Sequence, residues 1–179
     1  DKLNYRISGR YYDQGGMYKI RQDKYTRYNL RISGGVKVTP WLEVKINTEL
    51  SSYKYSDPFR NSNVWGLINI SGSGSPLAKV FNPDGTLTQT AASTIGVLYG
   101  ESESLTSKLQ TQTNISFVAD VIKNRWTLEG NFAYLNYLEE LDYKNVPIPY
   151  SVKPNTISMM GSSLIGQTLN KQNYYTYNL

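Results

Sequence analysis

The stretch of sequence that decides the fold spans residues 25–51 and reads YTRYNLRISGGVKVTPWLEVKINTELS. Its even positions from Tyr28 to Leu50 are mostly apolar, whereas its odd positions are mostly Arg, Lys, Glu, Asn and Ser. Successive side chains of a β-strand point to opposite faces, so this alternation predicts strands over residues 25–38 and 42–51, each with one apolar and one polar face. The short segment between them contains Pro40, which presets the φ of a turn.

The same alternation extends over most of the chain. It predicts further strands over residues 2–12, 108–120 and 125–134, and a sixth strand that begins near Asn173. The connections alternate in length. Two are tight turns, at residues 39–41 and 122–124, and three are long, at residues 13–23, 57–103 and 145–171. Within the second long connection we expect a short helix over residues 63–68 and a turn over residues 82–85.

Composition excludes several classes of protein. The 179 residues suggest one domain, and they contain no Cys and no His, so disulfides, His-ligated zinc and Ser-His-Asp catalysis are excluded. The net charge of +5 comes from dispersed basic residues, which argues against nucleic-acid binding. No apolar run approaches the roughly 18 residues of a membrane helix, which excludes a helical membrane protein. We therefore expect no enzyme, no cofactor and no metal site.

Short turns at one end of long strands and long loops at the other are typical of an outer-membrane β-barrel, with periplasmic turns and extracellular loops. The aromatic residues agree with this orientation. Trp41 and Trp126 lie beside the tight turns, and tyrosines gather toward the long loops. These are Tyr11, Tyr12, Tyr25, Tyr53, Tyr55, Tyr134, Tyr137 and Tyr143. We interpret them as two aromatic girdles at the two membrane interfaces.

In such a barrel the apolar residues of each alternating strand face lipid, and the polar residues between them line the lumen. The predicted lumen-lining residues are Arg6, Arg10, Arg27, Arg31, Lys37, Glu43, Lys45, Glu49 and Glu129. We expect them chiefly to form a ladder of ion pairs and hydrogen bonds between neighbouring strands, or to contact another part of the protein, rather than to touch a substrate.

Several stretches resemble the SusC/RagA-type TonB-dependent outer-membrane transporters. Residues 5–16, YRISGRYYDQGG, are similar to the family's pattern of a strand followed by Asp/Asn-Gln-x-Gly. Residues 25–31 followed by 37–42, and residues 76–77 with 82–86, are similar to family segments as well. The resemblance covers most of the chain and is strongest over residues 5–55.

The resemblance implies an antiparallel transmembrane β-barrel of about 22 strands, of which residues 1–179 supply about six. It further implies a plug, import of oligosaccharides or peptides, a SusD-like surface lipoprotein over the extracellular mouth, and energy from the TonB complex. The location would be the outer membrane of a Gram-negative bacterium, in contact with lipid. We expect the chain to be part of a longer polypeptide, because it begins without Met and ends within a predicted strand.

The long loops are the expected place of substrate contact. Trp65, Tyr99 and Tyr150 lie in them, and an aromatic face stacks well on the C–H surface of a sugar ring. Packing within the loops is the ordinary alternative for all three. The acidic residues Glu139, Glu140 and Asp142 suggest a calcium site only weakly, since a solvated loop edge explains them.

Two other functions remain open at this point. A small complete outer-membrane barrel, acting as an adhesin or structural protein, suits the chain length but needs eight strands rather than six. A soluble lipocalin-like binding barrel also alternates, but its lumen is apolar, whereas here the inner face carries Arg, Lys and Glu.

Overall fold

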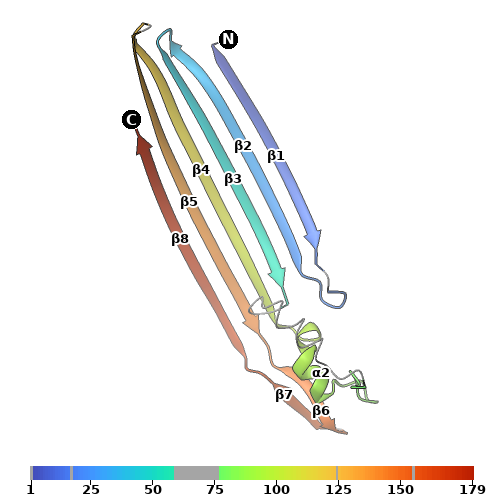
Figure 1. Cartoon of the computed structure of the whole chain (residues 1–179). Helices are drawn as coiled ribbons and strands as arrows, with labels where there is room; N and C mark the ends of the chain where they lie inside the picture. Colours follow the sequence, from blue (N-terminus) through green and yellow to red (C-terminus); the bar gives the residue numbers. More distant parts are fainter. Residues whose placement is uncertain (1, 17, 59–76, 124, 155) are drawn as a thin grey trace.

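The computed structural model describes residues 2–16, 18–58, 77–123, 125–154 and 156–179. Its main feature is an open antiparallel sheet of six strands in the order β1-β2-β3-β4-β5-β8, shown in Figure 1. The strands are β1 (Leu3–Gly15), β2 (Lys24–Thr39), β3 (Leu42–Asp57), β4 (Glu103–Ile122), β5 (Trp126–Asn145) and β8 (Leu164–Asn178). A second sheet of two strands contains β6 (Ile148–Lys153) and β7 (Thr156–Met160).

The first five predicted strands are confirmed. Each continues beyond the last residue that the alternation of apolar and polar residues predicted for it. The sixth strand was predicted to begin near Asn173, but β8 begins at Leu164. The prediction was wrong because residues 167–173 are polar at nearly every position, so no period-2 pattern is visible there. Residues 145–171 are likewise not one loop, since they contain β6, β7 and the first half of β8.

The two tight turns lie at one end of the sheet and the long connections at the other (Figure 1). Leu42 pairs with Ala119, which brings the β2–β3 and β4–β5 turns together, and the backbone N–H of Asp120 donates to the carbonyl of Trp41 at 2.8 Å. A register shift accompanies each turn, between Lys37 and Thr39 and between Asp120 and Ile122. The predicted separation of short and long connections is therefore confirmed.

The register places every apolar run on the same face of the sheet. Residues paired across an antiparallel ladder point to one face. One such row is Ile7, Ile32, Thr48, Thr113, Tyr134 and Tyr175, taken from β1 through β8. The next row is Ser8, Arg31, Glu49, Gln112, Leu135 and Tyr174. We call the side of the first row the apolar face and the side of the second the polar face.

Neither face of the sheet is covered by another layer among the described residues. The exposed fraction is 63% for Ile7 and 44% for Ile32. The buried apolar residues of the described ranges are Leu87, Ala91, Ala92 and Ala119, and the first three lie outside the sheet. The sheet is therefore a single layer with no packed core of its own.

A small loop module, which we define as residues 77–102 with β6 and β7, lies beyond the long-connection end of the sheet (Figure 1). It contains helix α2 (Gln89–Thr94), capped by Thr88, whose hydroxyl accepts a hydrogen bond from the backbone N–H of Ala91 at 3.2 Å. A short 3-10 helix, η1 (Gly96–Leu98), follows. The helix expected over residues 63–68 lies outside the described residues.

Asn82 ties the two halves of the loop module together. Its side-chain amide donates to the carbonyls of Ser151 at 3.1 Å and Leu87 at 3.4 Å, and to the hydroxyl of Thr86 at 3.0 Å. The predicted turn over residues 82–85 is confirmed, with Gly85 at a φ of 82°. No helix within the described ranges is long and apolar enough to cross a membrane.

Candidate functional site

The charged residues predicted to line a lumen share the polar face of the sheet. Arg6 and Arg10 lie on β1, Arg27, Arg31 and Lys37 on β2, Glu43, Lys45 and Glu49 on β3, and Glu129 on β5. The register pairs Arg6 with Ser33, Arg31 with Glu49, and Lys37 with Glu43. The alternation thus brings residues from four strands onto one surface.

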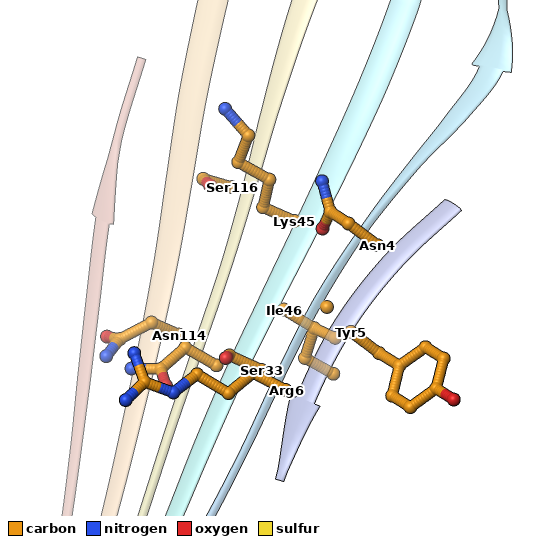
Figure 2. Close-up of a pocket in the computed structure, with 10 residues that line it drawn as sticks. Asn4, Tyr5, Arg6, Ser33, Lys45, Ile46, Asn114 and Ser116 are labelled. Atoms are coloured by element: carbon orange, nitrogen blue, oxygen red, sulfur yellow. The ribbon is translucent and has the colours of Figure 1, made fainter. Parts of the chain in front are cut away.

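Part of this surface is hollowed into a pocket of about 510 Å³, which Figure 2 shows. Its polar-face lining consists of Asn4, Arg6, Ser33, Lys45, Asn47, Asn114 and Ser116. Tyr5, Gly34 and Ile46 of the other parity complete the lining. In Figure 2 the ring of Tyr5 points away from the polar side chains, as its place on the apolar face requires. We call this hollow the Arg6 pocket.

The Arg6 pocket is positively charged. Among the described residues, its lining contains two cationic side chains, Arg6 and Lys45, and no carboxylate. Lys45 is partly neutralised, because its Nζ lies 3.3 Å from Oε1 of Glu43 on the same strand. Arg6 forms no ion pair or side-chain hydrogen bond with any of the described residues. Within the part of the chain that the structure describes, Arg6 therefore carries the unpaired charge of the pocket.

The two arginines of β2, Arg27 and Arg31, donate hydrogen bonds to neutral side chains. Arg27 donates to Oδ1 of Asn29 at 3.1 Å and to the hydroxyl of Ser51 at 3.2 Å. Arg31 donates to Oδ1 of Asn47 at 3.0 Å. The expected ladder between neighbouring strands is thus present around these two residues as hydrogen bonds. Within the described ranges, one ion pair joins two of the predicted lumen-lining residues, and it links Lys45 with Glu43.

Nearer the long connections, the polar face carries a row of aromatic rings. Tyr12, Tyr25 and Tyr53 lie on β1, β2 and β3, with ring centroids 6.0 Å and 5.5 Å apart. Lys108 on β4 continues the row, with its Nζ 5.5 Å from the ring centroid of Tyr53 and 5.8 Å from that of Tyr137. We call Tyr12, Tyr25, Tyr53 and Tyr137 the aromatic row.

An ion pair closes the aromatic row at β5. Nζ of Lys108 lies 2.7 Å from Oε1 of Glu139, and the hydroxyl of Tyr137 donates to Oε2 of the same carboxylate at 2.9 Å. Lys108 is not among the predicted lumen-lining residues, although it lies on the same face. The sequence does indicate this position, because Lys108 alternates with apolar residues in the same way as Gln110 and Gln112, and so belongs to the polar face of β4.

The register divides the tyrosines that were interpreted as a girdle. Tyr11 and Tyr134 lie on the apolar face, each with its ring centroid 5.0 Å from a neighbouring tyrosine, Tyr28 and Tyr175. The other six, Tyr12, Tyr25, Tyr53, Tyr55, Tyr137 and Tyr143, lie on the polar face. A lipid-facing girdle therefore cannot contain the whole set. The sequence could have indicated this division, because these six tyrosines alternate in step with the arginines and glutamates that define the polar face of their strands.

The aromatic residues predicted to contact substrate lie in the loops. The ring of Tyr99 packs edge-on against Phe81 with centroids 5.3 Å apart, so one of its partners is the loop module itself. Tyr150 is half-buried in β6, where it pairs with Ser158. Trp65 lies outside the described residues.

The acidic residues near the end of β5 do not converge. Glu139 lies on the polar face with Lys108, whereas Glu140 and Asp142 have the opposite parity, and Glu140 accepts a hydrogen bond from Gln167 at 2.7 Å. In the turn of the loop module, Asp84 accepts hydrogen bonds from the hydroxyl and backbone N–H of Thr86, which hold the pKa of Asp84 below its ordinary value. The described residues contain no group of three or more metal-ligating side chains.

Two comparisons with known proteins give no relative. No protein-family model matches the chain, and no curated protein matches it.

Proposed function

We propose that this chain forms part of the transmembrane β-barrel of a SusC/RagA-type TonB-dependent transporter in the outer membrane of a Gram-negative bacterium. In this proposal the parent protein imports oligosaccharides or peptides and catalyses no reaction. A SusD-like lipoprotein covers the end with the long connections, and the TonB complex acts through other parts of the polypeptide.

The observation that carries the proposal is the uncovered apolar face. Leucine, isoleucine, valine, phenylalanine and tyrosine side chains occupy this face from β1 to β8 and remain exposed. Soluble monomers rarely expose contiguous apolar patches larger than a few hundred Å². Lipid is a solvent in which such a face is favourable while the opposite, charged face contacts water.

The position of the apolar residues along the strands supports a membrane band. On β2 and β3 the apolar residues run from Leu30 to Val38 and from Leu42 to Leu50, next to the tight turn. About nine residues at ~3.3 Å per residue, tilted by roughly 40°, span close to the ~25 Å apolar band of an outer-membrane barrel. The long-connection ends of β4 and β5, each 20 residues long, then project beyond the membrane.

The two edges of the sheet support a larger barrel. Within the described residues, β1 pairs only with β2, and β8 pairs only with β5. Each outer edge therefore presents a row of unpaired backbone N–H and C=O groups, and in hydrocarbon each such group costs several kcal/mol. Further strands of the same polypeptide would satisfy both edges and close the barrel.

The proposal is tested in the source bacterium. Outer membranes are isolated and probed with an antibody against residues 77–102, and a deletion strain is grown on separate oligosaccharides and peptides. We expect a band on the order of 100 kDa, as about 22 strands with loops and a plug require, and loss of growth on one substrate class. A band with only the mass of residues 1–179, or a soluble protein, would contradict the proposal.

A further inference from the structure

Two pairs of tyrosine rings lie on the apolar face of the sheet, at different places along the strands. Tyr11 of β1 and Tyr28 of β2 have ring centroids 5.0 Å apart. Tyr134 of β5 and Tyr175 of β8 form a second pair at the same distance of 5.0 Å. Tyrosine is enriched at membrane–water interfaces, because its ring is apolar and its hydroxyl is polar. We call the line drawn across the sheet through these four rings the tyrosine line.

Polar side chains begin two residues beyond each pair, on the side of the long connections. Beyond the first pair, Asp13 lies opposite Thr26, whose hydroxyl donates to Oδ1 of Asp13 at 2.9 Å. Beyond the second pair, Asn136 lies opposite Asn173 and donates to its Oδ1 at 2.6 Å. The hydroxyl of Tyr134 also donates to Oδ1 of Asn173, at 3.4 Å, so it turns toward the polar side. Each pair therefore marks a change from apolar to polar residues.

The charged residues of the apolar face obey the same division. In the six strands, as far as the structure describes them, each of these residues lies on the long-connection side of the tyrosine line. The first ones met on each strand in that direction are Asp13, Lys24, Lys54, Glu103, Glu140 and Lys171. Toward the tight turns, the same face carries residues such as Ile32, Val44 and Phe132. Contact with hydrocarbon on that side would exclude charge in this way.

The tyrosine line crosses the strands obliquely. The register from β2 to β5 places Tyr28 in one row with Leu138, and Tyr134 lies four residues from Leu138, nearer the tight turn. Four residues are about 13 Å along a strand, and the three strand spacings from β2 to β5 are about 14 Å across the sheet. Both pairs therefore lie at one depth if the strands are tilted by roughly 42° from the membrane normal, and outer-membrane barrels have tilts of about 35–45°. Register and residue type determine this alignment, and further strands at either edge would leave both unchanged.

We propose that the tyrosine line is the boundary between the hydrocarbon core and the headgroup region of the outer leaflet. This inference rests on the proposed function and adds the depth at which lipid contacts the barrel. On the apolar face, residues between the line and the tight turns contact acyl chains, and residues beyond the line contact headgroups. Residues 136–145, half of the 20-residue strand β5, then lie outside the hydrocarbon together with the loop module.

The depth of spin labels in the bilayer tests this boundary. Residues 1–179 contain no cysteine, so single cysteines are introduced into a form of the full polypeptide with no other reactive cysteine. Each variant is labelled with a nitroxide and reconstituted into lipid vesicles. Collision rates of the nitroxide with oxygen, which concentrates in hydrocarbon, and with a water-soluble nickel chelate then report the depth of each label.

Three positions separate an oblique boundary from one that follows the rows of the sheet. We expect labels at positions 28 and 134 to lie at the same depth, and the label at position 138 to lie about 10 Å further toward water. Positions 30 and 136 form a matched pair that keeps all four tyrosines. They share one row, and we expect the label at 136 to lie about 10 Å further toward water than the label at 30. This second pair decides the question if a tyrosine variant fails to fold.

Equal depth within each row, at 28 and 138 and at 30 and 136, would overturn the inference. In that case labels at 30 and 134 still prefer oxygen, the apolar face still contacts lipid, and the proposed function stands. If instead the nickel chelate reaches all five positions and none prefers oxygen, the apolar face does not contact lipid, and the boundary and the proposed function both fail.

Discussion

The two faces of the six-stranded sheet consist of alternate residues of the same strands, yet their side chains meet different partners. On the apolar face, aliphatic and aromatic groups such as Ile7 and Ile32 stay exposed, and the described contacts include ring pairs such as Tyr11 with Tyr28. On the polar face, side chains are linked by hydrogen bonds and ion pairs, as in Arg31 with Asn47 and Lys108 with Glu139. A period of two in the sequence is therefore enough to give one sheet two faces of different chemistry.

The largest expected effect comes from placing a charge on each face at neighbouring positions. Ile32→Arg puts a guanidinium on the apolar face within the proposed membrane band and should destabilise the folded protein by about 2–4 kcal/mol. Gln112→Arg puts the same group on the polar face, in the next row of the sheet and opposite Glu49, and should change the folding free energy by less than about 0.5 kcal/mol. Urea titration of the full protein in lipid vesicles measures both. Equal losses would remove the distinction between the faces.

A smaller effect is expected from the ion pair that closes the aromatic row. Lys108 and Glu139 are 26% and 29% exposed, and an ion pair of this kind contributes about 0.5–1 kcal/mol. Lys108→Glu should therefore destabilise the protein by roughly 1 kcal/mol, because it also sets two carboxylates side by side.

The control for Lys108 is the exchanged pair. Lys108→Glu combined with Glu139→Lys restores opposite charges across β4 and β5 and should recover most of the lost stability. If the double variant is as unstable as the single one, the contact of the lysine with Tyr53 and Tyr137, rather than the ion pair, accounts for the loss.

The smallest effect is expected at Arg6. Its side chain has no ion pair or hydrogen bond within the described ranges, so Arg6→Gln should leave the folding free energy within about 0.5 kcal/mol of the original. The same urea titration measures this. A loss above about 1 kcal/mol would mean that Arg6 is held by a part of the polypeptide outside residues 1–179.

Most of the sheet follows from the sequence because one side of each strand is apolar. The strands around Leu30 and Val44 were predicted from alternation, as were the tight turn at Pro40 and the shared face of Arg6 and Arg31. A one-residue slip would exchange the two faces of a strand, so this pattern also specifies the register.

The rest depends on segments in which the pattern disappears. Residues 167–173 of β8 are polar at nearly every position, so alternation cannot connect Leu164 with the apolar rings at the end of the strand. The β6 strand contains Pro149, which suggests a loop and is tolerated because the two-stranded sheet consists only of edges. Asn4 and Asn114 both line the Arg6 pocket, and this shared lining depends on the β3–β4 pairing across a long connection.

The central claim is that the apolar face contacts lipid and the polar face contacts water. Residues 1–179 contain no cysteine, so single cysteines can be introduced at consecutive positions 30–36 of β2 in a form of the full protein with no other reactive cysteine. Their reaction with a membrane-impermeant maleimide is then measured in vesicles. The account predicts labelling at positions 31, 33 and 35 and protection at 30, 32, 34 and 36. Uniform labelling of all seven positions, or protection of the odd ones instead, would contradict it.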